Sequence, residues 1–167
     1  MDRSYLFAPG HNAKLLDRVF TAGADALMLD LEDAVPPEHK ADARRMVAAA
    51  LSAPPAPARA WVRVNTARTD ACAADLGAVG EHAYGIRIPK TESPDDVAWV
   101  AARAPGKPII CAIESARGVL AAQEIAAATV SATPRPSPSD ARSSSGRRSL
   151  KKRRSPPTRM AKPAHWM

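Results

Sequence analysis

The sequence predicts an α/β fold of the (β/α)8 TIM-barrel type, limited to about five βα units and followed by a disordered basic tail. Short apolar runs alternate with helix-period segments from the start of the chain. The ends of five runs follow one another at intervals of 24, 33, 24 and 25 residues; they are Phe7, Leu31, Val64, Ile88 and Ile113. Such an alternation indicates a parallel sheet.

An open doubly wound sheet is the alternative architecture. Its nucleotide-binding members carry Gly-x-Gly-x-x-Gly after the first strand or Gly-x-x-x-x-Gly-Lys in the first loop. Neither pattern occurs in this chain. The barrel is therefore the preferred architecture.

The five apolar runs are short and rich in Leu or β-branched residues, as buried parallel strands tend to be. We expect strands over residues 4–8, 26–31, 60–65, 84–89 and 108–114.

Apolar periodicity and capping signals predict helices between the strands. A stripe over 15–20 predicts the first helix, which we expect to end before Gly23, a residue suited to a C-cap. Pro36-Pro37-Glu38 is typical of a helix start, and Val47 and Leu51 continue the buried face of that second helix.

Two further helices are predicted in the second half. Ser93-Pro94-Asp95-Asp96 opens one of them, because serine caps a helix and proline is tolerated in its first turn. Ser115 is expected to cap the other, whose apolar residues include Val119, Leu120 and Ile125.

Charge divides the chain into two regions. Residues 1–128 hold 14 Lys and Arg against 16 Asp and Glu, a net charge of −2, whereas residues 129–167 hold 10 against one, a net charge of +9. The tail is rich in Pro, Ser and Arg and has few large apolar residues, so we expect it to be disordered. Residues 1–128 are predicted to form the folded domain.

Cysteine usage and hydropathy exclude several classes of protein. Cys72 and Cys111 are far apart and have no Cys or His at metal-binding spacing, so we expect reduced structural thiols. No apolar stretch approaches the roughly 18 residues that a membrane span needs, and no signal segment follows Met1. We therefore expect a soluble, cytoplasmic protein that does not bind membranes.

Three carboxylates end the second apolar run: Asp30, Glu32 and Asp33. Massed negative charge on an apolar element is costly unless it is hydrogen-bonded, paired or close to a cation, so the cluster indicates a site at the carboxyl end of a strand. The alternative is structural, since Asp33 could simply cap the next helix.

Other polar residues fall on the same level, where barrels carry their chemistry. Arg63 and Asn65 end the third strand, Lys90 the fourth and Glu114 the fifth. Alternation in Trp61–Asn65 predicts that Arg63 and Asn65 point into the barrel mouth if the valines between them face the helices. Taken singly, Arg63 could be an ion-pair partner and Glu114 a helix-start acid.

Five ordered motifs resemble the citrate lyase beta-subunit-like family of the HpcH/HpaI aldolase superfamily, over roughly residues 3–127. They are Ser4–Gly10, Leu29–Val35, Arg63–Asn65, Ile88–Lys90 and Ile113–Ala116.

The resemblance implies a magnesium-dependent lyase that cleaves or forms carbon–carbon bonds in acyl thioesters such as citryl, malyl or citramalyl derivatives of coenzyme A or an acyl-carrier protein. It implies that Glu114 binds Mg²⁺ and that Arg63 holds a substrate carboxylate or oxygen. Phe7 and Lys14 would lie near the carrier of the thioester.

Mg²⁺ and a nearby guanidinium would stabilise the enolate oxygen that this cleavage produces. Asp30, Glu32, Asp33, Asn65 and Lys90 would then support the centre, the acids by orienting metal-bound waters and Arg63. Intact relatives would be homo-oligomers.

The family pattern stops at about Ala127. The aspartate expected as the second metal ligand does not follow, and Asp140 lacks the Phe-Gly context that would mark it. A shifted reading frame past codon 128 is one hypothesis for the abrupt change of composition. We therefore expect weak activity or none from this chain.

A non-enzymatic protein is the alternative. Its basic run Lys151–Arg154 would bind nucleic acid or an anionic surface, but the tail has no interleaved aromatic residues and no recognition module.

Overall fold

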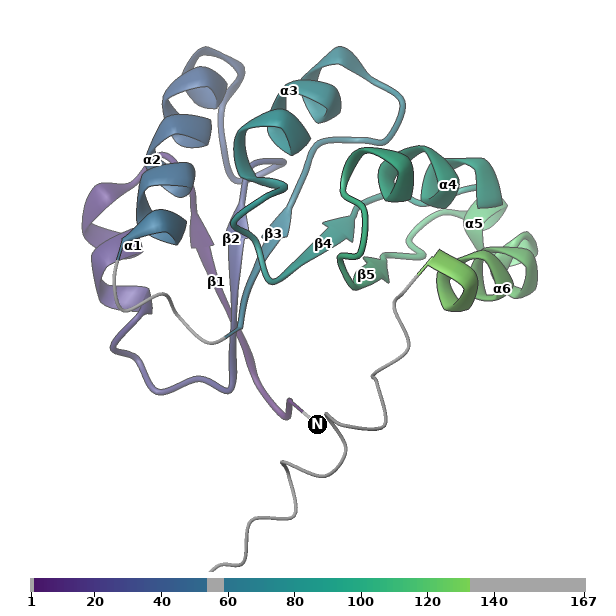
Figure 1. Ribbon diagram of the computed structural model, residues 1–167, viewed down its shortest axis with the longest axis horizontal. Coiled ribbons are helices and arrows are strands. Elements are labelled where there is room, and N and C mark those ends of the chain that lie inside the picture. Colours follow the sequence, from purple (N-terminus) through teal and green to yellow (C-terminus); the bar gives the residue numbers. More distant parts are fainter. Residues whose placement is uncertain (1, 54–58, 133–167) are drawn as a thin grey trace, which may run out of the picture. The chain divides into compact units, whose positions relative to one another are not determined.

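The computed structural model describes residues 2–53 and 59–132. In this part of the chain five parallel strands form one sheet in the order β1-β2-β3-β4-β5 (Figure 1). The strands are β1 (Tyr5–Pro9), β2 (Ala26–Asp30), β3 (Ala60–Arg63), β4 (Gly85–Ile88) and β5 (Ile109–Cys111).

Helical segments connect the strands. They are α1 (Ala13–Val19), the 3-10 turn Pro37–His39 leading into α2 (Lys40–Ser52), α3 (Asp70–Val79), α4 (Pro94–Arg103), α5 (Ala116–Leu120) and α6 (Ala122–Ala132). Successive helices pack against one another, α1 on α2, α2 on α3 and α3 on α4, outside the strands that they connect (Figure 1).

The strand order decides between the two predicted architectures. In a doubly wound sheet the order reverses at a switch point, whereas in a barrel each strand lies beside the next one in the sequence. All five strands here follow the sequence order without a reversal. The prediction of barrel-type βα units is therefore confirmed.

The core lies between the sheet and the helices. Leu29, Val62 and Ile86 are fully buried there, one from each of the three central strands. On the opposite face of the sheet the ring of Trp61 packs against Met28 and lies between the rings of Tyr5 and Tyr84. Gly85 makes room for that indole, because a Cβ at Gly85 would lie 2.4 Å from the Trp61 ring.

The predicted strands are all present, but the third ends at Arg63, two residues early, and the fifth ends at Cys111, three residues before Glu114. The side-chain alternation therefore does not extend to Asn65 as predicted. The first helix also ends earlier than predicted, with Phe20 as its C-cap, and Leu15 on its predicted buried stripe is 41% exposed.

The fourth predicted helix is two helices. Ala121 has non-helical backbone angles and ends α5, so the register of the apolar stripe is broken. As a result Ile125 is buried, but Val119 and Leu120 are 63% and 89% exposed, contrary to prediction. Helix α3, capped by Thr69, was not specifically predicted.

Helix α6 continues to Ala132, past the predicted domain boundary at residue 128. The prediction of disorder over 129–167 is therefore wrong for the first four of these residues. The rest of the tail, with Asp140 and Lys151–Arg154, lies outside the described residues. No helix in the described ranges is long and apolar enough to cross a membrane.

Candidate active site

The carboxyl ends of β2 and β3 bring Asp30 and Arg63 together. The two residues are register partners in the parallel ladder. The guanidinium of Arg63 donates from Nε to Asp30 Oδ1 at 2.7 Å and from Nη2 to Oδ2 at 2.6 Å. This two-bond geometry is the strongest form of the Arg–carboxylate interaction.

Asp30 is almost completely buried, with 1% of its surface exposed. The backbone N–H groups of Glu32 and Ala34 also donate to its two oxygens, at 2.9 and 3.1 Å. Burial acts to raise the pKa of Asp30, but the hydrogen bonds from Arg63 and Glu32 and the charge of Arg63 outweigh it and lower the pKa. Asp30 is therefore ionised at neutral pH and fixes Arg63.

Glu32 links Arg63 to Lys90. Its Oε1 accepts from Lys90 Nζ at 2.6 Å, and its Oε2 lies 3.2 Å from Arg63 Nη1. The second contact is an ion pair whose geometry does not make a hydrogen bond, so Oε2 is buried without a hydrogen-bond partner. Lys90 Nζ also reaches the exposed Asp33 at 3.2 Å.

Lys90 connects this cluster to β5. Its backbone is left-handed, with φ +46°, immediately after β4 and Pro89. Its N–H donates to Glu114 Oε1 at 2.8 Å while its ammonium binds the two acids beyond β2. Hydrogen bonds to Glu32 and then Asp33 raise the pKa of Lys90.

A second polar group holds the loop after β2 in place. Lys40 Nζ donates to the carbonyls of Leu31 and Glu32 and to Asn65 Oδ1, at 2.6–2.8 Å. Asn65 donates its amide to Asp75 of α3, and Asp75 also pairs with Arg44 at 2.7 Å. Asn65 therefore ties the loop to α3 and α2.

The loop after β1 approaches this group closely. The N–H of Gly10 donates to the carbonyl of Asp30 at 2.8 Å. A Cβ at Gly10 would lie 2.7 Å from that same oxygen and 2.8 Å from Val47 Cγ2. Only glycine allows this approach without movement of the neighbouring chain.

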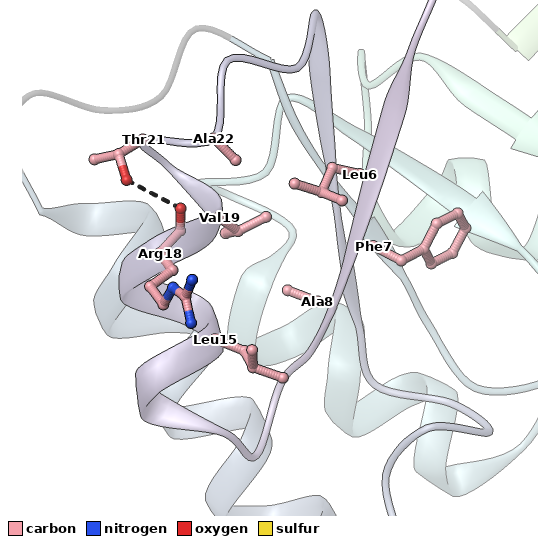
Figure 2. A pocket seen from close by; sticks show the side chains of 8 residues that line it. All are labelled: Leu6, Phe7, Ala8, Leu15, Arg18, Val19, Thr21 and Ala22. Atoms are coloured by element: carbon pink, nitrogen blue, oxygen red, sulfur yellow. Dashed lines mark hydrogen bonds between the residues drawn. The ribbon is translucent and has the colours of Figure 1, made fainter.

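Phe7 lies on the inner face of the sheet, the face opposite to the helices. Its ring centroid is 5.5 Å from Arg63 Cζ and 5.9 Å from Arg87 Cζ. Figure 2 shows the ring pointing away from the α1 side, toward which Leu6 and Ala8 point. Lys14 is exposed in the first turn of α1 and makes no hydrogen bond or ion pair with the described residues.

A cavity of about 350 Å³ lies between β1 and α1, lined mainly by apolar side chains such as Leu6, Leu15 and Val19 (Figure 2). The cavity is on the helix side of the sheet, whereas Arg63 lies over the ring of Phe7 on the opposite side. The cavity is therefore separate from the charged residues at the strand ends.

Glu114 is the predicted metal ligand, and it is an exposed side chain. Within the described ranges no group of three His, Cys, Asp or Glu residues could hold a metal ion. Mg²⁺ takes one or two carboxylates, completed by water and substrate oxygens. Glu114 fits as one such carboxylate, with water and substrate oxygens able to complete the coordination.

The structure thus joins most of the predicted site residues into one network. Arg63, Glu32, Lys90 and Glu114 are linked in that order, with Asp30 and Asp33 as further partners. Lys40, Asp75 and Arg87 were not predicted as site residues from the sequence. Arg87 gives the same signal as Arg63, a cation alternating with apolar residues in Gly85–Ile88.

Parallel strands in consecutive order, with cations and carboxylates gathered at their carboxyl ends, define the class of (β/α)-barrel proteins. The chain belongs to the HpcH/HpaI aldolase/citrate lyase family, whose sequence model matches residues 3–134.

Curated relatives include a (3S)-malyl-CoA thioesterase of Cereibacter sphaeroides, 40% identical over 127 residues, which cover 75% of this chain and 45% of the relative. Another is the citrate lyase subunit beta of Escherichia coli K12, 40% identical over 140 residues, covering 76% and 46%. The chain thus spans about half the length of the curated relatives it matches.

Solved structures give the same result. The citrate lyase beta subunit of Mycobacterium tuberculosis, complexed with oxaloacetate and magnesium, is 34% identical with a TM-score of 0.63; the match covers 74% of this chain and 52% of that one. A complex of the protein named CitE from the same organism with magnesium, acetoacetate and coenzyme A is 36% identical with a TM-score of 0.63, covering 74% and 44%.

Proposed function

We propose that this chain takes part in magnesium-dependent carbon–carbon bond cleavage of a short acyl thioester of coenzyme A or of an acyl-carrier protein, in the cytoplasm. The observation that carries the proposal is the linked series Arg63, Glu32, Lys90 and Glu114 at the carboxyl ends of four strands, β2 to β5. The relatives named for malyl-CoA, oxaloacetate and coenzyme A support this class of substrate.

Each described residue has a limited task in this proposal. Glu114 supplies one carboxylate to Mg²⁺, which when bound would act as a Lewis acid on a substrate oxygen. Arg63, held by Asp30, presents a fixed positive charge to the oxygen on which charge develops. Lys90 and Glu32 set the position of Glu114 relative to Arg63. The first strand and the segment after it, with Phe7 and Lys14, would meet the carrier of the thioester.

The described residues supply only one metal carboxylate, so we expect slow turnover unless another segment or a neighbouring chain of a homo-oligomer completes the site. The test is cleavage of (3S)-malyl-CoA and citryl-CoA by the full chain with and without Mg²⁺. We expect magnesium-dependent release of the cleaved acid, well below the rate of a full-length relative.

Two variants make the test specific. Glu114→Gln should remove the magnesium dependence, and Arg63→Gln should lower kcat/KM. Arg45→Gln is the matched control, because Arg45 is exposed on α2 and its one ion-pair partner among the described residues is Asp42. Equal cleavage by Glu114→Gln and by the unchanged chain would contradict the proposal. A rate equal to that of a full-length relative would contradict the expectation of slow turnover.

A further inference from the structure

Arg87 lies on the inner face of the sheet, opposite the helices, and its side chain has no hydrogen-bond or ion-pair partner among the described residues. Its neighbours Ile86 and Ile88 are fully buried against the helices, so the alternation of β4 turns Arg87 to the opposite face. The ladder pairs Arg87 of β4 with Arg63 of β3. Two guanidinium groups therefore lie side by side, both over the ring of Phe7.

The two arginines differ in how their charges are neutralised. Arg63 is bound by both oxygens of Asp30 and lies beside Glu32. The Arg87 guanidinium makes no hydrogen bond or ion pair with any residue in the described ranges, and its Nε is buried without a partner.

The three carboxylates at the end of β2 already have cationic partners among the described residues. Asp30 and Glu32 are engaged by Arg63 and Lys90, and Asp33 is engaged by Lys90. A guanidinium stays charged at any pH at which a protein is folded. A half-buried cation with unused donors is costly unless an anion completes it.

We propose that Arg87 is an anion-binding residue that takes a carboxylate of a short oxo acid or dicarboxylate, with Phe7 as the surface on which its guanidinium is stacked. The planar fork of N–H donors matches a carboxylate through two parallel hydrogen bonds. The ring of Phe7 holds the guanidinium by a cation–π contact.

This assignment changes the division of tasks at the site. Two of the three guanidinium nitrogens of Arg63 already donate to Asp30, and the third faces Glu32. No guanidinium N–H of Arg87 is used by a described residue, so Arg87 offers a second carboxylate more unused donors than Arg63 does. That this carboxylate belongs to the substrate rests on the proposed function, whereas anion binding at Arg87 does not.

The test is a titration of the full chain, labelled with ¹⁵N, with malonate and separately with inorganic phosphate, in the absence of Mg²⁺ and thioester. The Nε–Hε signal of Arg87, identified by its loss in Arg87→Lys, should shift and saturate with malonate. The signal of Arg63 should move less. The same fork of donors can also bind phosphate, so phosphate is the probe of selectivity; we expect it to bind more weakly than malonate.

Variants separate a specific site from general attraction. Arg87→Gln should weaken malonate binding at least ten-fold, Arg87→Lys should weaken it less, and Phe7→Leu should weaken it about three-fold. Arg45→Gln should leave the affinity unchanged. Circular dichroism of each variant establishes that it is folded, and Arg87→Lys retains the test if Arg87→Gln does not fold.

Equal affinity in Arg87→Gln and Arg45→Gln, or a shift of Arg63 in place of Arg87, would overturn the assignment. Equal binding of phosphate would overturn its selectivity for carboxylates. These outcomes are independent of the lyase proposal, because the titration contains no Mg²⁺ and measures no cleavage. Malonate binding without any cleavage of thioesters would contradict the proposed function alone.

Discussion

At the ends of β2 and β3 the buried charges are paired, whereas at the ends of β4 and β5 two charged side chains are not. Asp30, Glu32 and Arg63 contact one another or Lys90 within 3.2 Å. Arg87 and Glu114 have no ion pair with any residue in the described ranges, and Glu114 accepts only the N–H of Lys90. We expect the paired charges at β2 and β3, the paired half of the site, to stabilise the fold, and the unpaired charges at β4 and β5 to be available to a ligand.

The largest expected effect concerns the paired half. Asp30→Ala leaves the guanidinium of Arg63 without its main partner and frees the N–H groups of Glu32 and Ala34. Breaking a buried ion pair costs about 3–5 kcal/mol of unfolding free energy. Urea denaturation measures this loss.

The matched control is Asp42→Ala, which removes an exposed partner of Arg45 on α2. Such pairs contribute about 0–1 kcal/mol. If Asp30→Ala were as mild as Asp42→Ala, the paired half would not be what stabilises the fold.

The second effect concerns the close approach of Gly10. Gly10→Ala would place a Cβ 2.7 Å from the carbonyl oxygen of Asp30, so the loop after β1 must move. We expect a loss of about 1–3 kcal/mol, the usual cost of overpacking. Gly77→Ala in α3 is the control, because no atom lies within 4 Å of its added Cβ.

Replacing glycine by alanine in a helix gains about 0.5–1 kcal/mol. Thermal unfolding should therefore shift in opposite directions for the two variants. A shift in the same direction would show that the contact of Gly10 with β2 does not constrain the site.

The third effect is visible only in acid. The folded state lowers the pKa of Asp30 below its ordinary value of 3.8. The stability that this carboxylate contributes is therefore complete above pH 3.8 and is lost as the pH falls through the lower folded pKa. Asp30→Asn should flatten the acid limb of a stability–pH curve measured by urea denaturation.

Asp95→Asn is the control for the acid limb, because the Asp95 side chain is 83% exposed and lies 3.9 Å from its only ionic partner. We expect the acid limb to be unchanged in that variant. If the acid limb were the same in Asp30→Asn as in the unchanged chain, protonation of Asp30 would not be a cause of the loss of stability in acid.

Much of the fold could be predicted because it depends on local patterns. The strand alternation and the capping serines Ser93 and Ser115 are read directly from neighbouring residues. The break at Ala121 could not be predicted, since alanine favours a continuous helix and nothing in the neighbouring residues marks an end there.

The site shows the same division. Alternation predicts that Arg63 leaves the helix-packed face of its strand, and the same signal was available for Arg87 in β4. Which partner each cation takes depends on distances across the sheet, so the bond between Lys40 and Asn65 and the role of Asp75 required the structure. Sequence patterns indicate which residues can meet, and packing decides which of them are neutralised.

The smallest expected effect is on the stability contributed by Glu114. Glu114→Gln keeps an oxygen that can accept the N–H of Lys90, and the side chain is exposed, so we expect a change in unfolding free energy of less than about 0.5 kcal/mol. Glu32→Gln should cost more, because Glu32 is buried between Lys90 and Arg63. Urea denaturation of the two variants compares the same chemical change in the two halves of the site. A loss as large for Glu114→Gln as for Glu32→Gln would mean that Glu114 is part of the scaffold, and the division between a paired half and a ligand-binding half would fail.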